Sequence, residues 1–114
     1  MIKLITLFRR RPGISHEQCM EYWRDTHARL AQADHEFWSR VRKYTQNYVI
    51  STDGIDPQWD GVVELWFDDQ SSVDAAFGSA ETKAVLVADL KNFVDIDSMI
   101  SVSAKERTFY DATE

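Results

Sequence analysis

The chain is 114 residues long, which fits one domain over residues 1–114 and leaves no room for a second. Hydrophobic residues make up 44% of it and charged residues 28%, a composition that excludes disordered and collagen-like proteins. Nineteen acidic side chains against thirteen basic ones leave a formal charge of −6, opposite to the charge of a nucleic-acid binder. We therefore expect a globular protein with no nucleic-acid partner.

No apolar run is long enough to span a membrane, and Met1–Leu4 leads directly into a strand-like pattern without a cleavable signal. These features predict a cytoplasmic protein with no membrane contact. The single cysteine, Cys19, cannot form an internal disulfide, and we expect it to pack in the core.

The first expected elements are a strand over 2–8 and a helix that begins after Ser15. The strand is rich in apolar and β-branched residues and ends before a Pro-Gly turn. Ser15 and Gln18 have the spacing of a capping box, in which each side chain binds the backbone amide of the other residue. The stripe that this helix buries includes Trp23 and His27, but the sequence does not indicate where the helix ends.

Two further strands are expected over 40–50 and 60–67, joined by a turn-rich segment. Neither face of the first of these strands is cleanly apolar. In the second, Val63, Leu65 and Phe67 share one face, and Val62, Glu64 and Trp66 share the other. A carboxylate between two large apolar residues predicts either a sheet edge or a lined cavity.

The second half of the chain predicts a broken helix and a last strand. The helical pattern covers 69–77 and 80–93 with an interruption near Gly78-Ser79, and the strand covers 98–108. The residues of the helical pattern expected to point inward are Val73, Phe77, Leu86, Leu90 and Phe93.

The resulting order, βαββαβ, predicts an α+β protein with the ferredoxin-like plan, in which two helices cover one face of a four-stranded antiparallel sheet. This plan leaves the other sheet face uncovered. The simplest cover is the same face of a second copy, which predicts a homodimer closed through its sheet faces into a barrel.

Common catalytic and cofactor motifs are missing from the sequence. It contains no Gly-rich phosphate loop, serine-hydrolase elbow or zinc-protease motif. The three histidines, His16, His27 and His35, are scattered, and no third ligand is indicated beside His27 and His35. We therefore expect neither a metal nor an organic cofactor.

Three residues are candidates for proton chemistry. His27 is the best general acid or base because its ordinary pKa lies near neutrality, although a capping or surface histidine is an equal alternative. Tyr44 is a hydrogen-bond donor to a substrate oxygen if it does not serve packing alone. Glu64, if buried beside Trp66, would have a raised pKa and carry a proton; the alternative is a salt bridge to Arg42 or Lys43.

Several segments together resemble the EthD family of dimeric α+β barrel proteins: the opening strand leading into Arg-Arg-Pro-Gly-Ile-Ser-His-Glu-Gln, the helix Tyr22-Trp23-Arg24-Asp25-Thr26-His27, the strand segment Tyr44–Tyr48, and Asp60-Gly61-Val62-Val63-Glu64-Leu65-Trp66-Phe67. The resemblance implies a ferredoxin-like subunit, a dimer through sheet faces and a pocket between sheet and helices, with the family's pocket histidine at His27 and Trp23 beside it. Some members are linked to ether degradation as accessory proteins. Relatives of similar architecture catalyse decarboxylation, dehydration, cyclisation, lactone isomerisation or cofactor-free oxygenation.

We therefore expect a cofactor-independent lyase or isomerase that transfers a proton on a small hydrophobic molecule, either aromatic, polyketide-like or a lactone. In this hypothesis His27 is the acid or base, and Tyr44 and Glu64 position or polarise an oxygen. The residues expected to form the pocket wall are Phe8, Trp23, Tyr48 and Trp66. The alternatives are a non-catalytic accessory or ligand-binding protein and a cofactor-free monooxygenase.

Overall fold

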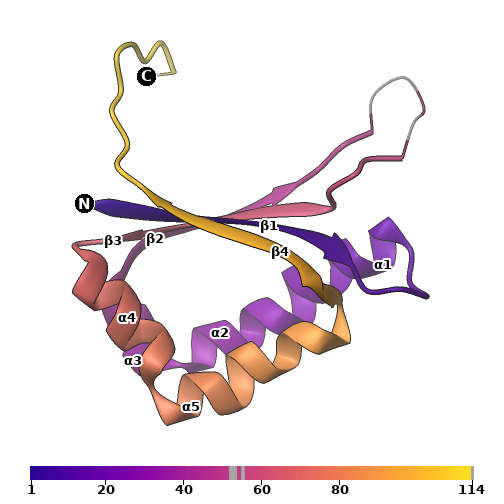
Figure 1. Ribbon diagram of the computed structural model, residues 1–114, viewed down its shortest axis with the longest axis horizontal. Helices are drawn as coiled ribbons and strands as arrows, with labels where there is room; N and C mark the ends of the chain where they lie inside the picture. Colours follow the sequence, from indigo (N-terminus) through magenta and orange to yellow (C-terminus); the bar gives the residue numbers. More distant parts are fainter. Residues whose placement is uncertain (52–53, 55, 114) are drawn as a thin grey trace.

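The computed structural model describes residues 1–51, 54 and 56–113. Four strands, β1 (Ile2–Arg10), β2 (Val41–Tyr48), β3 (Gly61–Phe67) and β4 (Val94–Ala104), form one sheet in the order β2-β3-β1-β4. All neighbouring strands are antiparallel. The helices lie on one side of the sheet, as Figure 1 shows, so the ferredoxin-like α+β fold is confirmed. Within the described residues, no helix has the length and apolar character needed to cross a membrane.

The first helical segment of the chain consists of α1 (His16–Glu21), η1 (Tyr22–His27) and α2 (Ala28–Ala33), followed by α3 (His35–Arg40). The expected capping box is present, since the Ser15 hydroxyl accepts the Gln18 amide and the Gln18 side chain accepts the Ser15 amide. The helix ends at Asp34, whose carboxylate caps α3 by accepting from the Phe37 amide. Asp34 also accepts a hydrogen bond from the Thr82 hydroxyl, which ties the two helical segments together.

The second helical segment consists of α4 (Gln70–Gly78), α5 (Ala80–Thr82), η2 (Lys83–Val87) and η3 (Leu90–Asn92). Asp69 caps α4, and Ser79 caps α5, so the expected interruption is a change of helix direction with its own cap. A capping hydroxyl satisfies amide groups that would otherwise lose their partners at the break.

The expected bounds of the last strand are corrected, and β2 departs from simple alternation. β4 begins at Val94 and ends at Ala104, earlier than expected, because its first residues pair with the end of β1. In β2 a register shift between Val41 and Lys43 puts Val41 opposite Phe67 in the core, although simple alternation would place Val41 on the same face as Lys43. A bulge adds one residue to a strand and therefore reverses the facing pattern on one side of it.

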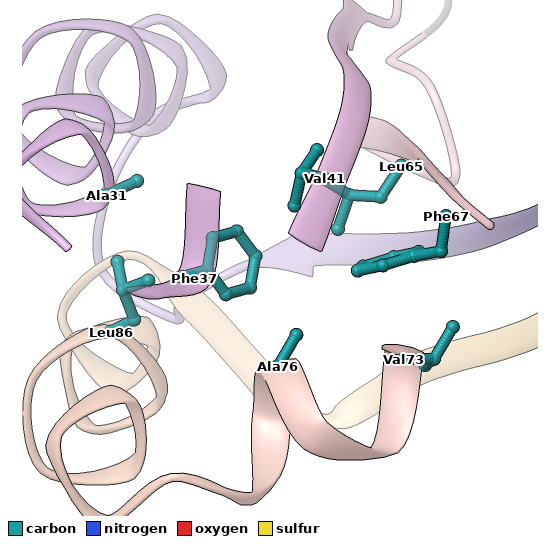
Figure 2. Packing of buried hydrophobic residues seen from close by; sticks show 8 residues of the cluster. All are labelled: Ala31, Phe37, Val41, Leu65, Phe67, Val73, Ala76 and Leu86. Carbon is teal, nitrogen blue, oxygen red and sulfur yellow. The ribbon is translucent and has the colours of Figure 1, made fainter. Parts of the chain in front are cut away.

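Two hydrophobic clusters lie between the sheet and the helices. One joins β3 to α3 and α4, and Figure 2 shows its side chains converging from the sheet and from both helical segments. The other surrounds Phe8, Trp23 and Phe93 at the opposite end of the sheet. Most of the inner face of the sheet is thus covered by packed side chains.

On the other sheet face, which we call the outer face, the residues that the structure describes form no helix (Figure 1). Strand pairing places a row of apolar residues on it, which we call the outer apolar strip: Ile5, Leu7, Ile100 and Val102. Ile100 and Val102 are each 50% exposed. The strip is therefore open to water in the single chain.

Candidate functional site

A cavity of about 120 Å³ lies between the inner sheet face and the helices; we call it the inner cavity. Its lining is mostly apolar and aromatic, with Phe8, Trp23 and Phe93 among the walls. The polar side chains in the lining are Thr6, His27 and Tyr44. Few polar groups in an apolar enclosure is the usual make-up of a small-molecule site, since each one then fixes the orientation of a ligand.

His27 reaches the cavity from η1, a segment of π-helix, which is a local helix form that often marks functional positions. Its imidazole Nδ1 lies 2.8 Å from Oδ2 of Asp89, and both side chains are buried. A carboxylate beside Nδ1 holds the proton there and leaves Nε2 as an acceptor. No hydrogen bond to Nε2 is found from any residue that the structure describes.

Burial is the largest influence on the His27 ring, and it lowers the pKa of His27 below the ordinary value of 6.5, although the Asp89 carboxylate acts in the opposite direction. His27 is therefore neutral near pH 7. Burial acts to raise the pKa of Asp89, but hydrogen bonds from Tyr22, Asn92 and His27 outweigh it and hold that pKa below its ordinary range. The pair is thus an uncharged imidazole beside an ionised carboxylate.

Two further residues hold Asp89 in place. The Tyr22 hydroxyl donates to Oδ1 at 2.6 Å, and the Asn92 amide donates to the same oxygen at 2.8 Å. With His27 on Oδ2, both carboxylate oxygens are engaged. Asp89 therefore keeps the imidazole in one orientation and one tautomer.

Tyr44 supplies the second polar group of the cavity. Its hydroxyl oxygen accepts from Trp23 Nε1 at 3.2 Å and from Gln46 Nε2 at 2.8 Å. Because both neighbours are donors, the phenolic proton has no acceptor among the described residues and is free to bind a ligand oxygen. Burial raises the pKa of Tyr44, so that the proton stays on the phenol near neutral pH.

Aromatic rings build the cavity wall beside these two groups. Phe8 meets Trp23 edge to face at 4.9 Å and Phe93 at 5.9 Å between ring centroids, and His27 lies 5.0 Å from the Phe93 ring. The expected wall residues Phe8 and Trp23 are thus beside His27. Phe93, which packs edge to face against Phe8, thus borders the imidazole on one side.

Glu64 and Trp66 lie elsewhere, and their expected place in one pocket with His27 is corrected. Strand alternation points them to the outer face, opposite to their neighbour Leu65 in the core. Glu64 pairs with Lys3 at 2.8 Å, and this hydrogen bond lowers the pKa of Glu64. It is therefore an ion-pair partner, with neither Arg42 nor Lys43 but with Lys3, and its pKa is lowered, not raised.

Trp66 and Tyr48 pack outside the inner cavity. The Trp66 ring lies under the ammonium groups of Lys3 at 5.0 Å and Lys43 at 4.7 Å on the outer face. Tyr48 shares the inner face with Tyr44 but contacts Trp23 from outside, with ring centroids 5.5 Å apart, and donates to Gln46. Neither residue lines the cavity.

The sequence did not indicate Asp89, the buried partner of His27. It lies 62 positions after His27, and nothing in its local pattern links the two. The available signal is its place near the end of the expected helix, three residues before Asn92, where a buried acidic side chain needs partners. In the described part of the chain, no group of three or more His, Cys, Asp or Glu residues is arranged to hold a metal ion.

The model of the EthD domain family matches residues 11–97, which include His27, Tyr44 and Asp89. No curated protein sequence matches the chain. Among solved structures, an EthD family protein from Bacillus halodurans aligns with a TM-score of 0.71 at 21% identity, covering 94% of this chain and 99% of that one.

A dimeric ferredoxin-like protein of unknown function from Bacteroides fragilis aligns with a TM-score of 0.67 at 18% identity, over 92% and 95% of the two chains. An antibiotic biosynthesis monooxygenase aligns with a TM-score of 0.60 at 15% identity, over 95% and 100%. At these identities the structural matches establish the fold, and the family model establishes the kinship. The chain belongs to the EthD domain family.

Proposed function

We propose that the inner cavity is an active site in which His27 removes a proton from carbon in a small, largely apolar molecule. Tyr44 donates a hydrogen bond to the neighbouring oxygen as negative charge develops on it. The observation that supports this most is the neutral, buried imidazole, which Asp89 holds by Nδ1 at the wall of an apolar cavity.

The proposed step moves one proton and one electron pair, and it needs no atoms beyond those of the substrate and His27. A carbon–hydrogen bond next to a carbonyl breaks, the proton moves to Nε2 of His27, and the electron pair moves onto the carbonyl oxygen beside Tyr44. The imidazolium then returns the proton to another carbon, which is an isomerisation, or to a departing hydroxyl group, which is a dehydration. Each outcome needs only His27 and Tyr44 of this chain.

The strength of this chemistry limits the substrate. One positioned acid or base typically contributes a factor of about 100 to 10,000, and one positioned oxyanion donor about 100 to 1,000. The carbon acid must therefore already be activated by a carbonyl, an ester or a phenolic ring.

The cavity size limits the substrate as well. An engineered cavity of about 150 Å³ in another protein holds one benzene molecule. The inner cavity, at about 120 Å³, is of the size that holds a single small ring. We therefore favour a lactone or a monocyclic ketone or phenol over a polycyclic substrate.

We also propose that the working unit is a homodimer joined through the outer face. The outer apolar strip has no helix packed on it within the part of the chain that the structure describes, and Ile100 and Val102 in it are half exposed. The Bacteroides fragilis relative is described as dimeric and has the same fold. Burying the strip against its own copy would remove these side chains from water.

Deuterium uptake tests the proton step without knowledge of the product. The protein is incubated in D2O with small unsaturated lactones, cyclic ketones and hydroxyphenyl ketones, and loss of the carbon-bound proton signal is followed by NMR. We expect accelerated exchange for at least one class, a loss of about 100-fold or more for His27→Gln, and a loss of about 100-fold for Tyr44→Phe.

His16→Gln is the matched control, since His16 also places Nδ1 against a carboxylate, that of Asp60, but does not line the inner cavity. Its exchange rate should equal that of the unaltered protein. Ligand binding without exchange would instead indicate a carrier, and oxygen uptake with a phenol would indicate a monooxygenase. Either result contradicts the proposed proton transfer.

A further inference from the structure

The end of the chain forms an extended segment that leaves the body of the molecule after β4; we call residues 105–113 the C-terminal arm. In Figure 1 the arm rises on the side of the sheet opposite to the helices. It carries two adjacent aromatic residues, Phe109 and Tyr110, which are 87% and 85% exposed. Adjacent aromatic side chains in water are unusual and are typical of protein contact surfaces.

The root of the arm is attached to the outer face. Glu106 pairs with Lys3 Nζ at 2.9 Å, and the same ammonium group pairs with Glu64 at 2.8 Å. Lys3 also lies over the Trp66 ring. These contacts fix where the arm starts on the outer face.

The arm and the outer apolar strip are on the same side of one chain. Nine extended residues span roughly 30 Å, enough to cross the sheet of a neighbouring molecule. In a two-fold dimer, each copy offers an arm and receives one, so both exposed features are covered without any other protein. The Arg107 guanidinium, 5.3 Å from the Phe109 ring, adds a residue type that is enriched in interfaces.

We infer that the C-terminal arm clasps a second copy of this chain, with Phe109 and Tyr110 as the residues that become buried on it. The inference rests on the homodimer proposed above and names a second contact in that dimer. Phe109 and Tyr110 are the anchors, and the pairing of Glu106 with Lys3 aims the arm.

Intermolecular spin labelling tests the contact directly. Ala112→Cys, close to the anchors, is labelled with a nitroxide and mixed with unaltered protein that carries ¹⁵N and no nitroxide. Only contacts between copies then broaden the detected signals. Cys19 does not interfere, because it is fully buried and burial raises the pKa of its thiol to about 12. We expect broadening confined to one surface of the ¹⁵N copy.

Sedimentation equilibrium measures the contribution of the anchors. The double variant Phe109→Ser/Tyr110→Ser should raise the dissociation constant of the dimer at least tenfold. Val85→Ser is the matched control, since Val85 is an exposed apolar residue on the helical side, and it should leave the constant unchanged. Circular dichroism confirms that each variant is folded.

The outcomes separate this inference from the proposals before it. A dimer whose constant does not change in the double variant, or a labelled arm that broadens no signal of another copy, overturns the clasp and leaves the sheet-face dimer. In a second sample the nitroxide and ¹⁵N are on the same molecule, which is diluted with an excess of unaltered protein without ¹⁵N; broadening in this sample alone means that the arm folds back on its own sheet and also overturns the clasp. A monomer at all concentrations overturns the dimer and the clasp together, while the deuterium-exchange result still decides the function of the inner cavity.

Discussion

His27 and Asp89 show how two residues from different helical segments become one chemical unit. In water, His27 alone would have an ordinary pKa and would be partly protonated near neutral pH, and Asp89 alone would be ionised. Burial of the ring lowers the pKa of His27, and three donors stabilise the ionised carboxylate of Asp89. The result is a neutral base with a fixed tautomer, which neither residue has by itself.

Asp89→Asn tests the fixed tautomer. The amide NH2 group that replaces Oδ2 can donate to Nδ1 and thereby place the ring proton on Nε2, where it blocks the lone pair that the proposed step needs. We expect the deuterium-exchange rate to fall by about 100-fold or more, with ligand affinity within threefold of the unaltered protein. ¹⁵N NMR of the imidazole should show a changed tautomer; an unchanged rate would contradict the role of Asp89.

The lowered pKa of His27 also predicts a pH-dependent stability. Between the folded pKa and 6.5 the unfolded chain binds a proton that the folded chain does not, so the free energy of unfolding falls as the pH decreases through this window. Above pH 6.5 the contribution is complete. Urea unfolding at pH 7.5 and 5.5 should show this loss, and the loss should be smaller in His27→Gln; equal losses in both proteins would show that other groups cause it.

At the scale of the elements, β3 approaches β1 and η1 closely at its first residue. Gly61 lies opposite Phe8 in the sheet, and a Cβ built on Gly61 would lie 2.7 Å from Phe8 Cε1 and 2.8 Å from Trp23 Cζ3. The edge-to-face contact between Phe8 and Trp23 thus depends on the missing side chain. The cavity wall and the start of β3 are packed as one structure.

Gly61→Ala should therefore destabilise the protein by about 1 to 3 kcal/mol, because the new methyl group overpacks two buried rings. Gly78→Ala is the matched control, since a Cβ at Gly78 meets no atom within 4 Å, and we expect it to be neutral or slightly stabilising. Urea denaturation of both variants makes the comparison. Equal stability of the two would show that the wall yields easily.

Asp60 joins β1, β3 and α1 from a fully buried position. Its carboxylate accepts from the Arg10 backbone amide at 2.7 Å, from Arg10 Nη1 at 3.0 Å and from His16 Nδ1 at 2.6 Å. Burial acts to raise the pKa of Asp60, but these hydrogen bonds outweigh it and lower that pKa. The stability contributed by Asp60 is therefore present at neutral pH and is lost as the pH falls through the folded pKa.

Asp60→Asn should lower the free energy of unfolding by about 3 kcal/mol at pH 7, the low end for breaking a buried ion pair, since Arg10 and His16 keep some access to water. The contrast is Asp68→Asn, which breaks an exposed pair with Arg42 and should change stability by less than about 1 kcal/mol. Urea unfolding measures both. A small effect at Asp60 would mean that the three elements are held by packing alone.

At the scale of the whole molecule, the two faces of the sheet have different fates. The inner face is used up by helices and by the cavity, whereas the outer face combines the outer apolar strip with a charged cluster around Lys3, Glu64 and Trp66. A face of this kind is typical of sheets that pack on a partner. The site and the proposed interface are therefore on opposite sides of one sheet.

Val102→Asp tests the proposed interface. A carboxylate in the centre of a buried apolar contact costs several kcal/mol, so we expect the dimer dissociation constant to rise about 100-fold. The monomer fold should be unchanged, because Val102 is half exposed in the single chain. Sedimentation equilibrium measures the constant, and Val85→Asp on the helical side is the control that should not alter it.

The sequence predicted the order and type of the main elements because their causes are local. The alternation of Val63, Leu65 and Phe67 follows from the two-residue period of a strand, and the capping box follows from the spacing of Ser15 and Gln18. Simple alternation failed at Val41, where a bulge reverses the faces, because the pairing partner creates a bulge and the strand's own pattern does not show it.

The candidate site was predictable only in part, for a related reason. His27, Trp23, Phe8 and Tyr44 were each recognisable by residue type and by their place on a face, and all four line the inner cavity. The sequence could not assign Glu64 to its partner Lys3, because the choice depends on which residues the sheet places side by side.

The sequence by itself determined the period of each strand and helix, the caps and the family, since all of these depend on residues a few positions apart or on recognisable motifs. Only the tertiary structure decided that Asp89 holds His27, that Tyr44 keeps a free proton, and that Glu64 faces away from the cavity. These contacts join distant parts of the chain, and their partners are chosen when the core packs.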